Sequence, residues 1–296
     1  MPSTAQELLE LLELEEIESG LYRGQNPVTK RQRAFGGQVL AQALVAAYRT
    51  VPDELTVHSL HAYFLRPGRT DRPMIYDVEV MRDGRSFATR RVVARQDNQM
   101  IFAVTASFQV AEPGLEHQDA FPDVPPPEDC PRMSEVLAAQ TGQSASFWES
   151  EWGALDFRWI GSATPEGPIP GSVVALDAGD HSSVARAWVR VEDRLPDDPR
   201  LHQAALAYAS DLTLLAVSTV PHGRPLDSVQ AASLDHAMWF HRPVAADRWW
   251  LYDQASPSAT NARGFATGRI FAEGQLGASV AQEGLIRVID KQIDKQ

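Results

Sequence analysis

The chain has 296 residues, 44% apolar and 22% charged, a composition that supports a hydrophobic core and excludes disordered and collagen-like classes. Its 39 acidic and 27 basic residues give a formal net charge of -12, which disfavours a nucleic-acid partner. Cys130 is the only cysteine, so an internal disulfide and a cysteine-based metal cluster are excluded, and we expect no metal.

The first long element is a helix expected over Gly36–Val51. Gly36 and Gly37 open this helix, and two glycines there let a ligand approach backbone N–H groups, where the helix dipole favours negative charge. Such a pair is more often only a tight turn, so it does not define a site by itself. Apolar residues with the spacing of one buried stripe follow at Val39, Leu40, Ala43, Leu44 and Ala47.

Extended segments rich in aromatic and β-branched residues follow the helix, and the same order returns later in the chain. His61–Pro67 is similar to His236–Pro243, and Arg85–Val92 is similar to Arg263–Ile270. An internal repeat of one helix and several strands predicts an α+β protein in which each antiparallel sheet wraps its own helix.

The first half is expected to end near residue 112 with a strand that faces the core. Alternation places an uninterrupted apolar set on one face of this strand: Met100, Phe102, Val104, Ala106, Phe108 and Val110. Residues 113–150 are rich in proline up to Gly142 and predict a semi-rigid linker. The domains are therefore predicted as 1–112 and 151–296, joined by that linker.

A second helix is expected over Leu201–Val220, and it carries Asp211 beside its apolar stripe. A carboxylate in that position needs hydrogen-bond donors. The first helix offers no counterpart, because no Asp or Glu occurs from Lys30 through Pro52. Asp211 is therefore either a carboxylate at the rim of the helix or part of a site that only the second half contains.

The last strand of the second half carries one polar residue, Gln282, on its core-facing row, where the repeat has Ala106 in the first half. A buried amide costs about 1 to 3 kcal/mol unless it is hydrogen-bonded, and Asp211 is a candidate partner. Either residue alone could be structural. Two polar residues at core-facing positions of the same half favour a single, asymmetric functional site.

Ser233 precedes the strand that carries Asp235 and His236. A hydroxyl at a strand end most often bonds nearby backbone, and neighbouring strand residues point to opposite faces, so the Asp-His pair does not form a triad. Which face of this strand points inward is not determined by its pattern. Motifs of serine esterases, nucleotide-binding loops and zinc proteases are absent.

The sequence resembles the acyl-CoA thioesterase II family. Members of this family have a double hot-dog fold, in which two repeats are fused and the sheet of each repeat wraps a long helix. The resemblance covers nearly the whole chain. It is carried by Gly20–Gln25, Phe35–Leu40, His58–Gly68, Arg82–Phe87, Ala207–Asp211, Leu234–Arg242 and Ser279–Gly284.

The resemblance implies hydrolysis of fatty acyl-CoA to a free fatty acid and CoA by a water that an Asp, a Thr and a Gln hold, without a cofactor. The family's Asp and Gln fall on Asp211 and Gln282, and its Thr falls on Ser233, which keeps the hydroxyl but lacks the methyl group. His58 and the Gly36-Gly37 pair are the substrate-binding candidates, the glycines through backbone donors for the thioester oxygen.

A non-catalytic acyl-CoA-binding or regulatory protein is the alternative, although it would not need Asp211, Ser233 and Gln282 together. Arginine sets at Arg31 and Arg33, and from Arg82 to Arg91, are possible contacts for the CoA phosphates. We expect a homo-oligomer by fold analogy. No run of eighteen apolar residues occurs, so we expect no membrane partner and a cytoplasmic protein.

Overall fold

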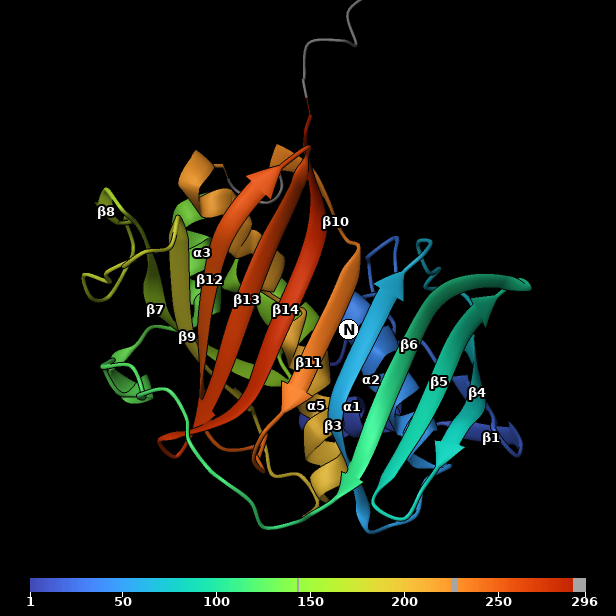
Figure 1. Ribbon diagram of the computed structural model, residues 1–296. Coiled ribbons are helices and arrows are strands. Elements are labelled where there is room, and N and C mark those ends of the chain that lie inside the picture. Colours follow the sequence, from blue (N-terminus) through green and yellow to red (C-terminus); the bar gives the residue numbers. More distant parts are fainter. Residues whose placement is uncertain (143, 225–227, 290–296) are drawn as a thin grey trace, which may run out of the picture.

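The computed structural model describes residues 1–142, 144–224 and 228–289, and within them one antiparallel sheet of 14 strands curves over the helices (Figure 1). The strands of the first half are β1 (Glu15–Glu18), β2 (Leu21–Gly24), β3 (Leu55–Phe64), β4 (Met74–Asp83), β5 (Phe87–Gln96) and β6 (Gln99–Val110). Those of the second half are β7 (Leu155–Thr164), β8 (Gly167–Pro168), β9 (Ser183–Val191), β10 (Val229–Ser233), β11 (Asp235–Phe240), β12 (Trp250–Thr260), β13 (Arg263–Ala272) and β14 (Gln275–Val288).

The two halves meet where β3 pairs with β11, with Ala237 opposite His61. The strand order is β1-β2-β4-β5-β6-β3 in the first half and β11-β14-β13-β12-β9-β7-β8 in the second, and β10 pairs with β14 beside β11. Outward from the junction, the long strands are β3, β6, β5 and β4 in the first half and β11, β14, β13 and β12 in the second, all paired antiparallel. This arrangement confirms the predicted repeat of sheet and helix.

The core helices α2 (Gly36–Tyr48) and α5 (Pro199–Ser210) pack against each other under the centre of the sheet. They run in opposite directions, since the start of α2 lies at the end of α5 while Tyr48 at the end of α2 contacts Gln203 near the start of α5. Alanines on both helices allow this close approach, and nearly all of them are fully buried.

The predicted core-facing rows are present in the sheet. Phe102, Val104, Ala106 and Phe108 of β6 are buried, as are Ala278, Val280, Gln282 and Gly284 of β14. On β11 the inward side chains are those of His236, Met238 and Phe240. Gln282 is therefore a polar side chain in an otherwise apolar interior row.

The prediction of one helix over Leu201–Val220 is wrong, because α5 ends at Ser210 and a 3-10 helix, η2 (Leu214–His222), follows. The Ser210 hydroxyl lies within hydrogen-bond distance of the Ala207 carbonyl, and Tyr252 of β12 donates to the Ser210 carbonyl at 2.8 Å. These side chains take backbone acceptors that a continuing helix would use. Asp211 becomes the C-cap of α5.

The segment Pro199–His222 is long and apolar enough to span a bilayer by length and composition alone. However, 72% of its most apolar window is buried inside the protein. It is the interior pair of α5 and η2, which the sheet covers.

The proline-rich connection between the halves is more ordered than a linker. It passes along the lower edge of the molecule in Figure 1 and over the second half, where Trp188 donates to the Pro125 carbonyl at 2.8 Å. It then forms η1 (Pro127–Asp129), α3 (Met133–Thr141) and α4 (Ala145–Trp152), and α1 (Ala5–Leu12) completes the helices. The predicted boundary at residue 150 falls inside α4.

Candidate active site

Asp211 lies where the end of α5 meets the start of α2. Asp211 is 9% exposed, and its side chain faces the beginning of α2. Asp211 is the C-cap of α5, and η2 begins only at Leu214. The end of α5 therefore places the carboxylate beside the start of α2. A buried carboxylate requires donors, and three elements supply them.

Gln282 of β14 and Ser233 at the end of β10 both bond this carboxylate. The Gln282 Nε2 group donates to Asp211 Oδ1 at 2.5 Å and to Ser233 Oγ at 3.0 Å, and Ser233 donates to the same Asp211 oxygen at 3.2 Å. The three residues predicted from sequence as catalytic thus form one closed triangle. The buried Gln282 Oε1 has no partner among the described residues and remains free to accept a hydrogen bond.

Gly36 and Gly37 begin α2 directly against the triangle. A Cβ atom at Gly36 would lie 2.6 Å from Asp211 Oδ2, and one at Gly37 would lie 2.2 Å from the Tyr208 carbonyl oxygen. Only glycine therefore allows the carboxylate and the helix N-terminus to approach so closely. The Gly37 backbone N–H also bonds the Asp211 carboxylate, and Phe35 caps α2 without a side-chain hydrogen bond.

Burial raises the pKa of Asp211 to about 6, although hydrogen bonds from Gln282, Ser233 and Gly37 oppose this shift. His236, which is fully buried on β11, lies with Nδ1 3.8 Å from Asp211 Oδ1. Burial lowers the pKa of His236 to about 3, so its ring is neutral at physiological pH. Asp211 is consequently the stronger base of the two.

A cavity of about 530 Å³ opens beside Asp211, Ser233 and Gly36. Its walls are mostly apolar and come from both halves and from the connection between them. The apolar lining includes Phe35, Phe64, Ile101, Phe102, Trp148, Trp152, Leu212 and Leu215. Arg31, Arg33 and Arg66 line the same cavity, so an apolar chamber, a base and positive charges are contiguous.

His58 does not line this cavity. It lies on β3, where its Nε2 atom is 2.9 Å from Ser107 Oγ of β6 and its ring packs on Phe87. The structure brings together five of the six predicted site residues and leaves His58 apart from them. Reasoning from sequence missed Trp148 and Trp152 of α4, the first at the end of the predicted linker and the second just after it.

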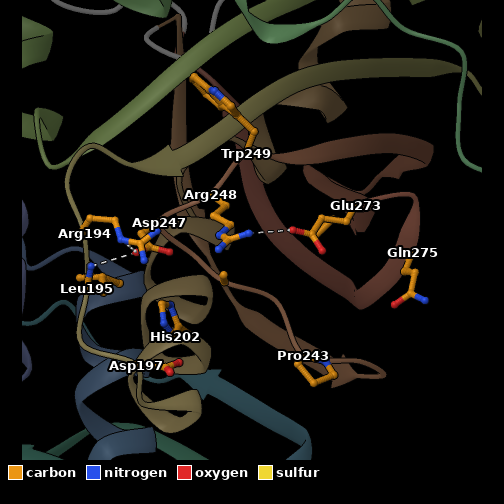
Figure 2. A pocket seen from close by; sticks show the side chains of 12 residues that line it. Arg194, Leu195, Asp197, His202, Pro243, Asp247, Arg248, Trp249, Glu273 and Gln275 are labelled. Atoms are coloured by element: carbon orange, nitrogen blue, oxygen red, sulfur yellow. Dashed lines mark hydrogen bonds and ion pairs between the residues drawn. The ribbon is translucent and has the colours of Figure 1, made fainter.

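A second cavity of about 390 Å³ lies at the other end of α5 (Figure 2). Its charged side chains largely pair with one another: Arg248 with Glu273 at 3.3 Å and Arg194 with Asp247 at 3.5 Å. Asp247 also accepts from the Leu195 backbone N–H, as Figure 2 shows. None of the catalytic candidates lines it. Within residues 1–142, 144–224 and 228–289, no cluster of His, Cys, Asp or Glu suits a metal ion.

Comparison with known proteins covers both halves. A family model described as "Acyl-CoA thioesterase" matches residues 170–285, and one described as "Acyl-CoA thioesterase N-terminal domain" matches residues 26–109. The chain is 38% identical to Acyl-CoA thioesterase 2 of Haemophilus influenzae over 95% of this chain and 96% of that protein.

Solved structures agree with this similarity. The acyl-CoA thioesterase II TesB2 from Mycobacterium marinum has 43% identity and a TM-score of 0.79, over 96% of this chain and 98% of that one. A hot-dog protein from Alicyclobacillus acidocaldarius, at 22% identity, has a TM-score of 0.74 over 95% of this chain and 98% of that one, and shows the fold alone. The α+β double hot-dog fold is therefore confirmed, and the chain belongs to the acyl-CoA thioesterase II family.

Proposed function

We propose that this protein hydrolyses fatty acyl-CoA to a free fatty acid and CoA, with a water molecule activated at Asp211. The observation that carries the proposal is the triangle of Asp211, Ser233 and Gln282 at the start of α2. The family membership supports the same substrate class. The apolar cavity beside the triangle suits an acyl chain.

Asp211 acts as the general base. With its pKa raised to about 6 it is ionised at pH 7 yet still accepts a proton readily. Gln282 and Ser233 fix the carboxylate, and the free Gln282 Oε1 can accept a hydrogen bond from the attacking water. Asp211 removes one proton as the water oxygen bonds to the thioester carbon.

The carbonyl oxygen becomes negatively charged in this step, and the N-terminus of α2 stabilises it. The N-cap residue Phe35 makes no side-chain hydrogen bond, and the positive end of α2, where the Gly37 N–H bonds Asp211, faces the reacting group. The C–S bond then breaks. A thiol has a pKa of about 8.5, so CoA leaves as the thiolate and takes up a proton without a dedicated acid.

Release of free thiol from a panel of acyl-CoA thioesters, short to long, tests the proposal. The wild type should turn over part of the panel, and Asp211→Asn should lower kcat by about 10³-fold with substrate binding retained. Unchanged turnover in Asp211→Asn would reject the assigned base. Saturable binding without turnover by the wild type would favour the non-catalytic binding protein.

We also propose that the protein is a cytoplasmic homo-oligomer. Tyr63 of β3 and Trp239 of β11 are 61% and 37% exposed, on the outer face of the strands that join the halves. Large exposed aromatics on a sheet are typical of subunit contacts. Light scattering should give a mass above that of one chain, and Trp239→Glu should lower it; a monomeric wild type would contradict the proposal.

A further inference from the structure

Three arginines at the active-site cavity lack an acidic partner. Arg31, Arg33 and Arg66 line the cavity and are exposed, and none forms an ion pair with a carboxylate of the described residues. In a protein of net charge -12, an unpaired cluster of positive charge is unusual.

The two loops that carry these arginines are bonded to each other. Ala34 donates its backbone N–H to the Gly68 carbonyl at 2.8 Å, and Thr70 donates its hydroxyl to the Arg31 carbonyl at 3.2 Å. The arginines therefore come from neighbouring segments that are held side by side, although Arg31 and Arg66 are far apart in sequence.

Two of the side chains are also positioned. The Arg31 guanidinium lies 5.2 Å from the centre of the Trp152 ring, and Arg66 donates to the Met100 carbonyl at 2.8 Å. Glu151, a carboxylate of the same helix α4 as Trp152, accepts a hydrogen bond from the Thr29 hydroxyl at 2.8 Å. The guanidinium groups keep donors for a ligand.

We propose that Arg31, Arg33 and Arg66 form an anion-binding rim that holds the phosphate groups of the CoA moiety. The inference rests on the proposed function, because acyl-CoA is the molecule that brings several phosphates to this cavity. Guanidinium groups suit phosphate because their fixed forks bond two oxygens at once. The acyl chain then lies inside the apolar chamber, and the thioester lies between chamber and rim, at Asp211.

Arginines elsewhere that the sequence also suggested for phosphate are engaged or distant. Arg90 is buried, bonds Thr50 and pairs with Asp83, while Arg91 pairs with Glu79. Arg85 is exposed at the turn between β4 and β5 and does not line the cavity. Arg85 therefore provides a matched control with the same charge and exposure.

The test compares two thioesters of the same fatty acid: the acyl-CoA, and the acyl-N-acetylcysteamine ester, which carries the same reacting group without phosphate. Replacing Arg31, Arg33 or Arg66 by Ala should lower kcat/KM for acyl-CoA about threefold to fivefold each, and the triple variant by at least about thirtyfold. The acyl-N-acetylcysteamine rate should be unchanged, as should both rates in Arg85→Ala.

An equal loss of kcat/KM for the two thioesters, or no loss in the triple variant, would reject the anion-binding rim. Calorimetric titration with CoA alone decides the question without turnover: the triple variant should bind at least about tenfold more weakly than the wild type. Equal CoA affinity would overturn the rim even if hydrolysis were intact. Conversely, weaker CoA binding with an inactive wild type would support the rim and reject the proposed function.

Discussion

Each of the two core helices begins where the other one ends, and the two junctions differ in the side chain that the ending helix contributes. At the start of α2, the end of α5 supplies Asp211, which Ser233 and Gln282 bond. At the start of α5, the end of α2 supplies Tyr48, whose hydroxyl bonds Gln203 and accepts the Val57 N–H. Asp211 is thus replaced by a phenol whose pKa burial raises above its ordinary value.

The remaining positions differ in the same direction. The repeat places Val57 where the second half has Ser233 and Ala106 where it has Gln282, and both are buried apolar residues. At the start of α5, Pro199 has no N–H and Asp198 caps Arg200, whereas at the start of α2 the N-cap residue Phe35 makes no side-chain hydrogen bond and the Gly37 N–H bonds Asp211. The junction at Tyr48 therefore has no carboxylate base, while the junction at Gly36 holds Asp211 with its hydrogen-bond donors.

The charges around the two cavities show a further contrast. Arg194 and Arg248 in Figure 2 are paired with Asp247 and Glu273, whereas Arg31, Arg33 and Arg66 form no ion pair with a carboxylate in the part of the chain that the structure describes. Similar backbone frames thus give one internally neutralised cavity and one that can bind an anion. The contrast between the two sites shows that a few side chains, and not the backbone fold, determine which of them can hold a base and bind an anion.

The largest effect should come from making β14 resemble β6. Gln282→Ala removes the donor to Asp211 and Ser233, so kcat/KM should fall by about 10²–10³-fold. Gln42 is a matched control, because it is a fully buried glutamine of α2 that bonds Tyr76 and the Leu11 carbonyl. Gln42→Ala should lower the melting temperature but keep most of the kcat; equal rate losses would contradict a specific role for Gln282.

Closing the start of α2 should have the next largest effect. A methyl group in Gly36→Ala meets Asp211 Oδ2 and the Phe64 ring, so we expect kcat/KM to fall about a hundredfold. Alanine is a better helix former than glycine, so unfolding should show little loss of stability. Pro199→Ala at the start of α5 is the control, and its rate should match the wild type. An active Gly36→Ala enzyme would show that the close approach is not needed.

The pH dependence should report the burial that raises the pKa of Asp211 to about 6. The charged form is the base, so kcat/KM should be constant above about pH 7 and fall tenfold per pH unit below about pH 6. A carboxylate in water would keep the rate constant down to about pH 4. A plateau that extends to about pH 5 would show that burial does not raise the pKa of the catalytic carboxylate.

The smallest effect concerns the hydroxyl. Ser233→Thr keeps the donor to Asp211 and restricts its rotamers, so kcat/KM should stay within about threefold of the wild type. Ser233→Ala should lower kcat/KM about tenfold, because the hydroxyl that donates to Asp211 and accepts from Gln282 is then lost. Steady-state kinetics of both variants separates the loss of the hydroxyl from the restriction of its rotamers. A Ser233→Ala enzyme as fast as Ser233→Thr would show that the hydroxyl has no role in catalysis.

Much of this arrangement follows from sequence patterns. Alternation identifies the row of Gln282, the helical stripe identifies Asp211, and the repeat shows that both lack counterparts in the first half. The end of α5 at Ser210 could not be predicted, because it depends on Tyr252 from a distant strand. The inward position of His236 was likewise open, since both faces of β11 mix polar and aromatic residues. The prediction of one linker over residues 113–150 misses α4, which Trp148 and Trp152 anchor by ring contacts with Phe157 and Phe35.

A crystal structure with a non-hydrolysable acyl-CoA, in which a methylene replaces the thioester sulfur and the carbonyl is kept, tests the central claim most directly. We expect one ligand per chain, with its carbonyl carbon between Asp211 and Gly36 and its phosphates at Arg31, Arg33 and Arg66. A carbonyl bound in the cavity of Figure 2, beside Asp247 and Glu273, would contradict the assignment of catalysis to the triangle.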